Sequence, residues 1–205
     1  PIANYYRRYS MVSPTSDDDV QDTIPTPVKI IVAGGFGVGK TTFVGSVSEI
    51  PPLTTEELLT EASDGIDDLN GVERKTTTTV ALDFGRITIS PKHVLYLFGT
   101  PGQERFWFMW DELARGAIGT VVLVDTRRLD TSFAAIDFFE RRRIPFIVAV
   151  NCFDNAQRYQ EHEIRGALAV PTHVPIVMCD ARQRDSSKLA LIKLVKHAMS
   201  ALPVR

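Results

Sequence analysis

A glycine-rich segment near the N-terminus carries the residue types that bind phosphate groups. Residues 34–41 read GGFGVGKT and fit the pattern G-x-x-x-x-G-K-[ST] at every fixed position. In such a loop the backbone N–H groups point at phosphate oxygens, and the N-terminus of the following helix favours negative charge. Lys40 would reach the outer phosphates and the Thr41 hydroxyl would bind Mg²⁺. We expect these residues to contact a nucleotide: Gly34, Gly35, Phe36, Gly37, Val38, Gly39, Lys40, Thr41 and Thr42.

The residues on either side of this loop decide whether the motif has the right context. Residues 28–33 (VKIIVA) form a short apolar, β-branched run that predicts a buried strand, and residues 42–48 read as the start of a helix. A tight glycine turn that happens to precede Lys-Thr would not need this strand–loop–helix order. The sequence therefore predicts a phosphate-binding loop of the P-loop NTPase type.

Beyond this loop, strand-like and helix-like segments alternate. Two strand-like runs, 80–89 and 92–98, are too close for a crossover helix and should form an antiparallel hairpin through Ser90-Pro91. Further strands are expected at 120–124, 146–150 and 176–178, and helices at 106–114, 131–142, 160–169 and 187–202. This order predicts a three-layer α/β fold whose six-stranded sheet is mostly parallel with one antiparallel edge strand.

The composition is that of one globular domain. The chain has 205 residues, of which 44% are apolar, and a formal net charge of −2. Nothing in this balance indicates a nucleic-acid partner or a basic membrane-seeking face. No apolar run approaches the length of a membrane-spanning helix, and Cys152 and Cys179 lie in apolar surroundings where they should remain reduced. We expect a cytoplasmic protein without direct membrane insertion.

Two segments fall outside the regular alternation. Residues 13–22 are polar and acidic, and Pro25 and Pro27 follow them, so we expect a flexible segment over 1–27 before a domain at 28–205. Met11 could be the natural start, in which case residues 1–10 would not be native. The interval near 50–75 reads as an insertion that opens with a helix over 54–59, capped by Thr54 and Glu57. It could be a solvated loop or a lid beside the site.

Three loops follow predicted strands at the edge where the phosphate loop should lie. They are 99–104 (GTPGQE), 151–154 (NCFD) and 179–182 (CDAR). In order and placement they resemble the loops of the Ras-like small GTPases. They are more closely similar to those of the actinobacterial conservon GTPases and the related bacterial gliding-polarity GTPase. The resemblance extends over about residues 28–202 and implies a GTP/GDP-binding switch with Mg²⁺ and slow GTP hydrolysis.

The resemblance also implies roles for single residues. Gly102 would donate its N–H to the γ-phosphate, and Gln103 would orient the attacking water, with Lys40 as the second catalytic residue. Thr79, four residues before Asp83 in a run of threonines, would be the second Mg²⁺ ligand beside Thr41. The run of threonines could instead be the β-prone start of a strand, and Gln103 could be a solvated residue at the start of a helix.

The remaining loops would hold the base. Asp154 would accept hydrogen bonds from N1 and N2 of guanine, which adenine cannot donate because its N1 is an acceptor. Asn151 would tie the loops together, and the N–H of Ala181 would contact guanine O6. The alternative for Asn151 and Asp154 is an ordinary helix cap.

The pattern departs from the family in places that leave other functions open. Gly99 stands where an aspartate normally holds Mg²⁺ through water, so metal affinity could be low or another acid could substitute. Cys152 replaces the lysine that packs over the base, and Asp180 and Arg182 flank Ala181 in place of Ser and Lys. A nucleotide-holding scaffold without hydrolysis and an ATP-using P-loop enzyme therefore remain alternatives.

A run of large apolar residues points to a protein partner. Residues 106–110 (FWFMW) cannot all face one core on a helix, because successive residues turn by about 100°. One or two should stay near the surface unless the insertion covers them, and exposed aromatic side chains mark partner sites. The family resemblance implies a Roadblock-type regulatory protein and a sensor-kinase-like complex, through which any membrane association would arise.

Overall fold

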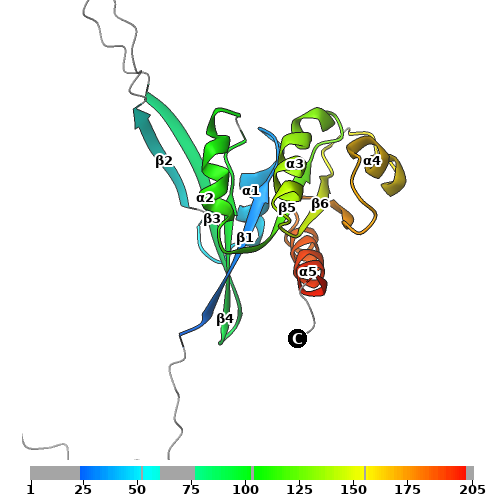
Figure 1. Cartoon of the computed structure of the whole chain (residues 1–205). Coiled ribbons are helices and arrows are strands. Elements are labelled where there is room, and N and C mark those ends of the chain that lie inside the picture. Colours follow the sequence, from blue (N-terminus) through cyan, green and yellow to red (C-terminus); the bar gives the residue numbers. More distant parts are fainter. Residues whose placement is uncertain (1–23, 52, 61–76, 103, 155, 202–205) are drawn as a thin grey trace, which may run out of the picture.

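A single sheet with helices on both faces forms the body of the molecule (Figure 1). The computed structural model describes residues 24–51, 53–60, 77–102, 104–154 and 156–201, and of residues 53–60, 77–81, 104 and 105 it describes the backbone. The predictions for residues 1–23 and for the greater part of the interval near 50–75 lie outside the described residues. Within the described part, no helix has both the length and the apolar character needed to cross a bilayer.

The sheet has the order β2-β3-β4-β1-β5-β6-β7. Parallel pairing joins β4, β1, β5, β6 and β7, whereas β3 pairs antiparallel with β4 as the predicted hairpin. The mostly parallel α/β fold is therefore confirmed. The strands are β1 (Thr26–Ala33), β2 (Leu53–Thr60), β3 (Thr77–Ser90), β4 (His93–Gly99), β5 (Ala117–Val124), β6 (Phe146–Asn151) and β7 (Ile176–Cys179).

Strand β2 corrects two sequence predictions. The sequence predicts a capped helix over these residues and a six-stranded sheet with one antiparallel edge strand. Instead β2 pairs antiparallel with β3, from Leu53 opposite Phe84 to Thr60 opposite Thr77, and adds a seventh strand at the edge. The physical reason is the length of β3, whose 14 residues extend past β4 and offer an edge that β-prone threonines can pair with.

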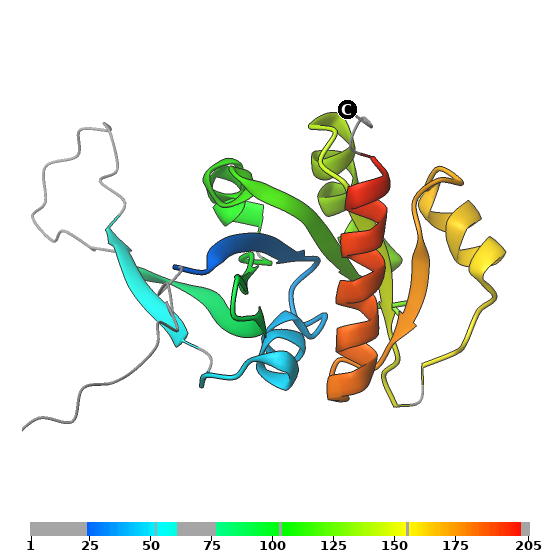
Figure 2. The same ribbon diagram turned by 90° about the horizontal axis from the view of Figure 1, so that it is seen from below.

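The helices divide between the two faces of the sheet (Figures 1 and 2). On one face α1 and α5 bury Phe43, Leu191 and Leu194 against β1 and β5, and on the other α2, α3 and α4 bury Trp110, Phe139 and Ile164. The buried strand residues alternate between these two cores, as a sheet covered on both sides requires. The helices are α1 (Lys40–Val47), α2 (Trp110–Ala114), α3 (Phe133–Arg141), α4 (Glu161–Leu168) and α5 (Arg184–Ser200), with 3₁₀ helices η1 (Glu104–Met109) and η2 (Leu129–Ser132).

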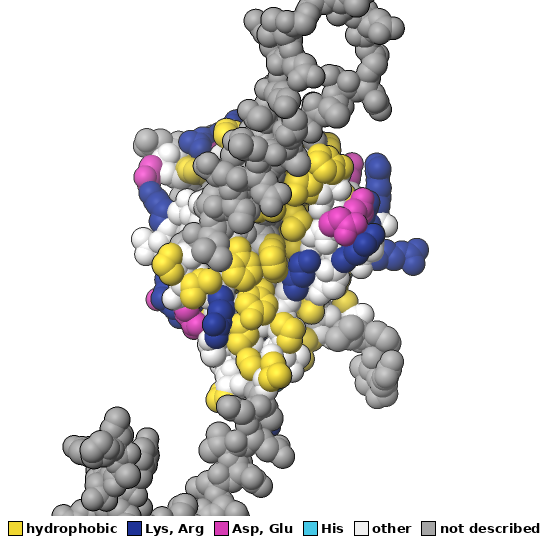
Figure 3. Space-filling model, turned by 90° about the vertical axis from the view of Figure 1, so that its left-hand side faces the viewer, with side chains coloured by type: hydrophobic (Ala, Val, Ile, Leu, Met, Phe, Trp, Pro, Cys, Tyr) yellow, Lys and Arg dark blue, Asp and Glu magenta, His cyan; other side chains and the backbone are white. Residues whose placement is uncertain are grey.

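The apolar run 106–110 forms the end of η1 and the start of α2. Phe106 and Trp110 are buried, and the Trp110 indole donates to the Pro101 carbonyl at 3.2 Å and packs against Phe139. Phe108, in contrast, is 67% exposed. The prediction that part of this run stays at the surface is confirmed. Figure 3 shows that hydrophobic side chains gather on the side of the molecule that faces left in Figure 1.

Candidate functional site

The phosphate loop lies between β1 and α1, as the sequence predicts. Gly34, Gly37 and Gly39 have φ values of 137°, 72° and 102°, in the region that favours glycine. A Cβ on Gly34 would also collide with the Leu123 carbonyl oxygen. The loop therefore requires glycine for its backbone conformation as well as for close approach. Gly34, Gly35 and Val38 are buried, whereas Phe36, Thr41 and Thr42 are exposed.

Lys40 and Gly102 meet in this loop. The Lys40 ammonium donates to the carbonyls of Gly34 at 2.9 Å and Gly35 at 2.7 Å, and its side chain is buried. A Cβ on Gly102 would lie 2.7 Å from that ammonium and 2.8 Å from the Phe36 N atom. The structure thus brings the glycine of the 99–104 loop against the phosphate loop, although Gln103 lies outside the described residues.

Burial of Lys40 makes its charge costly. Desolvation lowers the pKa of Lys40 from 10.5 to about 8, and the Asp83 carboxylate opposes this shift. Lys40 is therefore mostly protonated at neutral pH and can bind an anion, but the surrounding protein groups stabilise its charge poorly. A phosphate beside it would favour the protonated form.

The cost of burying the Lys40 charge predicts that the stability of the nucleotide-free protein depends on pH. Below pH 8 Lys40 is charged in both the folded and the unfolded state, so the cost of burying its charge lowers the free energy of unfolding in full. Between pH 8 and 10.5 the unfolded chain binds more protons, so the Lys40 contribution to the free energy of unfolding rises with pH. The difference between a pKa of about 8 and 10.5 corresponds to about 3 kcal/mol. Denaturant unfolding at pH 7 to 10 should show this rise in the wild type relative to Lys40→Met, and parallel curves would contradict it.

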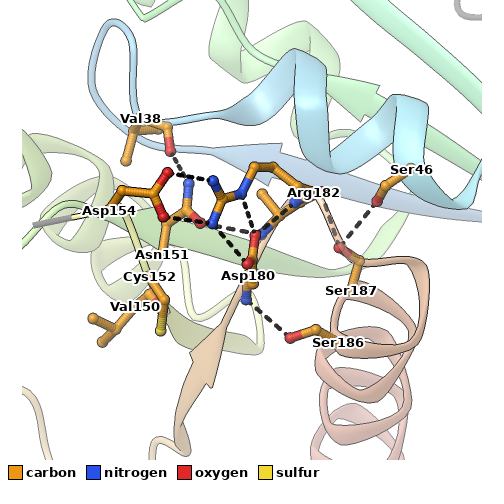
Figure 4. A network of polar contacts seen from close by, with 11 residues as sticks. Val38, Ser46, Val150, Asn151, Cys152, Asp154, Asp180, Arg182, Ser186 and Ser187 are labelled. Carbon is orange, nitrogen blue, oxygen red and sulfur yellow. Dashed lines mark hydrogen bonds and ion pairs between the residues drawn. The ribbon is translucent and has the colours of Figure 1, made fainter. Parts of the chain in front are cut away.

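Asn151 connects the phosphate loop to the base loops. Its side-chain amide donates to the Val38 carbonyl at 2.9 Å, and its side-chain carbonyl accepts from the Ala181 N–H at 3.1 Å (Figure 4). A Cβ on Gly39 would lie 2.5 Å from the Asn151 amide nitrogen. Three separate loops therefore meet at one buried side chain, as the expected role of Asn151 requires.

The 151–154 and 179–182 loops lie side by side at the ends of β6 and β7. The Cys152 N–H donates to the Cys179 carbonyl at 2.7 Å, and a pocket of about 500 Å³ lined in part by Asp154, Asp180 and Arg182 lies between the loops. The Asp154 carboxylate is exposed and pairs with Arg182 at 2.7 Å, which lowers the pKa of Asp154. Arg182 also lowers the pKa of Asp180.

A cation site is suggested by residues of α1 and β3. The Thr41 hydroxyl donates to the buried Asp83 carboxylate at 2.8 Å. Asp83 lies opposite Gly99 in the β3–β4 pairing, and a Cβ on Gly99 would come within 2.9 Å of the Asp83 carboxylate. Asp83 therefore fills the space where a side chain at position 99 would lie. Mg²⁺ is held by one or two carboxylates together with substrate phosphates, so this donor set fits that ion. The Thr79 backbone lies in β3, and its side chain lies outside the described residues.

Residues after β5 support the phosphate loop, a role that the sequence analysis missed. The buried Asp125 carboxylate pairs with Arg127 at 2.8 Å and with Arg128 at 3.7 Å, and Arg128 donates to the Phe36 carbonyl at 3.1 Å. A Cβ on Gly35 would meet the Thr131 hydroxyl at 2.5 Å. The acid at the C-terminal end of a buried strand was the available signal, but its arginine partners depend on the loop conformation.

Comparisons with known proteins agree on the fold and differ on the nucleotide. A family model described as a conserved hypothetical ATP binding protein matches residues 32–201. An uncharacterized protein of Methanocaldococcus jannaschii is 33% identical over 129 residues, which are 62% of this chain and 71% of that protein. The Ras-related protein Rab-1C of Dictyostelium discoideum is 27% identical over 187 residues, which are 86% of this chain and 83% of that protein.

Solved structures support the same conclusion about the fold. The G domain of the T. maritima FeoB iron transporter superimposes with a TM-score of 0.58 at 19% identity, over 84% of this chain and 99% of that domain. The cytosolic domain of that transporter gives a TM-score of 0.59 at 18% identity, over 84% of this chain and 64% of that domain. The predicted Ras-like P-loop fold is confirmed. The finer resemblance to conservon and gliding-polarity GTPases stays a prediction.

Proposed function

We propose that this chain, which belongs to the family described as conserved hypothetical ATP-binding proteins, is a guanine-nucleotide switch. It binds GTP and GDP with Mg²⁺, hydrolyses GTP slowly and presents a different surface in each state. The observation that carries this proposal is the double hydrogen bonding of Asn151, which joins the phosphate loop at Val38 to the base loop at Ala181. A ligand with both phosphates and a base fits a site joined in this way.

The preference for guanine rests on the Asp154 carboxylate. A carboxylate accepts hydrogen bonds but cannot donate them, and guanine offers N–H donors at N1 and N2 where adenine offers an acceptor at N1. The Ala181 N–H now donates to the Asn151 side-chain carbonyl, and it would turn from that oxygen to donate to guanine O6. The description of the family as ATP-binding favours the second candidate, an ATP-using P-loop protein, which would leave Asp154 without a partner on the base.

For Mg²⁺ we propose Thr41 and Thr79 as ligands, with Asp83 as the carboxylate that takes the role lost at Gly99. The 2.8 Å contact between the Thr41 hydroxyl and Asp83 supports this assignment. The ion, when bound, neutralises charge on the β- and γ-phosphates.

The remaining steps of hydrolysis are assigned to residues of the chain. Gln103 orients a water for in-line attack on the γ-phosphorus, so that a bond forms to the water oxygen as the bond to the β–γ bridging oxygen breaks. GDP leaves with the electron pair of that bond, and the protons of the water pass to phosphate and solvent. The Lys40 ammonium and the Gly102 N–H stabilise the charge that develops on the phosphate oxygens.

The catalytic assignment predicts a separation of binding from hydrolysis in Gln103→Leu. The variant should bind GTP as tightly as the wild type but release phosphate at least ~10-fold more slowly, because the water is no longer oriented. Single-turnover phosphate release measures this, with Gln157→Leu, an exposed glutamine before α4, as the matched control. An unchanged rate would remove Gln103 from the chemistry.

The switch surface is proposed to contact a regulatory protein of the Roadblock type within a sensor-kinase-like complex. Support comes from Phe108, which is exposed in η1, and separately from the hydrophobic side chains that gather on the side of the molecule shown in Figure 3. Multiple-turnover phosphate release with and without such a partner separates a switch from a scaffold that holds nucleotide permanently. No turnover in either condition would favour the scaffold.

A further inference from the structure

The Arg182 guanidinium lies between two carboxylates in the base loops (Figure 4). Its two terminal nitrogens donate to both oxygens of Asp154, at 2.7 and 3.2 Å. Its Nε and one terminal nitrogen donate to both oxygens of Asp180, each at 2.9 Å. Arg182 therefore forms a two-point contact with each acid at the same time.

The contact with Asp154 has the same form as the contact expected for guanine. Guanine presents two neighbouring N–H donors, at N1 and N2, to the two oxygens of one carboxylate. Arg182 already presents two N–H donors to those same oxygens. A carboxylate accepts one such two-pronged donor along its open edge, because a second would occupy the same space. Guanine and Arg182 must compete for Asp154.

We propose that Arg182 sets the purine selectivity of this site by competing with guanine for the Asp154 carboxylate. When Arg182 is paired with Asp154 (the closed state), the site presents a guanidinium, which only donates hydrogen bonds and suits the acceptor nitrogens of adenine. When the two side chains separate (the open state), Asp154 is free to accept hydrogen bonds from guanine. The proposal rests on the proposed function, in that it places the base of a bound nucleotide beside Asp154.

Asp180 makes the opening feasible. When Arg182 leaves Asp154, it keeps its contacts with Asp180, whose backbone N–H is itself held by the Ser186 hydroxyl at 2.9 Å. The backbone N–H of Arg182 also donates to the Asp180 carboxylate at 3.0 Å, so the loop backbone need not rearrange when the Arg182 side chain moves. The guanidinium thus has a charged partner in both positions.

The Arg182–Asp154 ion pair is exposed to solvent, and this limits its effect on nucleotide selectivity. The side chains of Arg182 and Asp154 are 51% and 76% exposed. Ion pairs this accessible to water are weak and screened by salt, so the closed state is only modestly favoured. We therefore expect Arg182 to shift nucleotide selectivity by ~3- to 10-fold and not to block guanine completely.

The test compares GDP and ADP affinities by calorimetry in the wild type, Arg182→Ala and Asp154→Ala. Arg182→Ala should raise the ratio of GDP to ADP affinity by ~3- to 10-fold, and added salt should raise this ratio in the wild type. In an Asp154→Ala background the same change should leave the ratio unaltered. Arg184→Ala, an exposed arginine at the start of α5, removes the same charge nearby and should have no effect.

Two results would overturn the inference. An unchanged ratio in Arg182→Ala, with or without a parallel loss of both affinities, would give Arg182 a merely structural role in the loop. A shift of the ratio toward ADP would mean that Arg182 assists guanine. Failure of the proposed function looks different: the wild type and all variants would bind neither nucleotide, or all of them would bind ADP and not GDP, and this inference would fall with it.

Discussion

Lys40→Met is expected to lower the affinity for GDP by at least ~100-fold, because charge-assisted hydrogen bonds to phosphate contribute about 1.5–3 kcal/mol each. The Lys40 ammonium now donates to the carbonyls of Gly34 and Gly35, and it would turn to the phosphates when they enter. Methionine keeps an unbranched side chain of similar length but has no donor. Calorimetric titration with GDP in Mg²⁺ measures the loss.

This variant separates binding from folding. Because burial lowers the pKa of Lys40, a neutral replacement removes a buried charge, and the folded state should persist at neutral pH. Circular dichroism of the variant should therefore match the wild type while binding is lost. Lys193→Met, an exposed lysine on α5, is the control and should bind GDP normally. GDP affinity within threefold of the wild type in Lys40→Met would reject the phosphate-loop assignment.

Asp83→Ala is expected to remove most of the effect of Mg²⁺ on GDP binding. The buried Asp83 carboxylate and the Thr41 hydroxyl lie 2.8 Å apart, and the carboxylate would hold the ion directly or through water. The ratio of GDP affinity with Mg²⁺ to that with chelator should fall at least ~10-fold, since outer ligands of a metal contribute 10–100-fold. GDP titration in the two conditions gives the ratio without any assay of hydrolysis.

A second substitution offers a rescue of this loss. Gly99 lies opposite Asp83, with the Asp83 carboxylate 2.9 Å from its Cβ position. The Asp83 Cβ lies equally close, at 2.9 Å, so Asp83→Gly is the variant that frees the space; adding Gly99→Asp to Asp83→Gly should return a carboxylate to the site and restore part of the Mg²⁺ effect. Gly99→Asp alone should be destabilised, because two carboxylates would occupy one buried space. A Mg²⁺ effect that is unchanged in Asp83→Ala would contradict the assignment of Asp83.

The layers of the fold were predictable because each element has its own local pattern. Residues 30–33 and 146–150 are continuous apolar runs, which suit strands covered on both faces, and α5 carries Leu191 and Leu194 on its buried face. Strand β2 was not predictable in this way. Its capping signal at Thr54 is local, whereas its strand conformation depends on pairing with β3, which lies beyond residues 61–76 in the sequence.

In the candidate site, too, local motifs were predictable from the sequence, whereas roles that depend on tertiary contacts were not. The phosphate loop was predictable because its residues are contiguous and its glycines have a conformational reason. Asp83 stands beside Phe84 in a strand, and only the register that places it opposite Gly99 gives it a role at the cation site. Arg182 replaces a lysine of the resembling family, and its contact with Asp154 depends on how two loops meet. Roles that arise from cross-strand pairing and loop contacts leave little trace in one sequence.

We propose that Asp154 gives this P-loop protein a preference for guanine. Calorimetric titration of the nucleotide-free protein with GDP, GTP and ATP in Mg²⁺ measures that preference. GDP and GTP should bind at least ~10-fold more tightly than ATP, even with Arg182 competing, because adenine leaves the carboxylate unpaired. ATP binding as tight as GTP binding would contradict the guanine assignment and favour the ATP-using alternative.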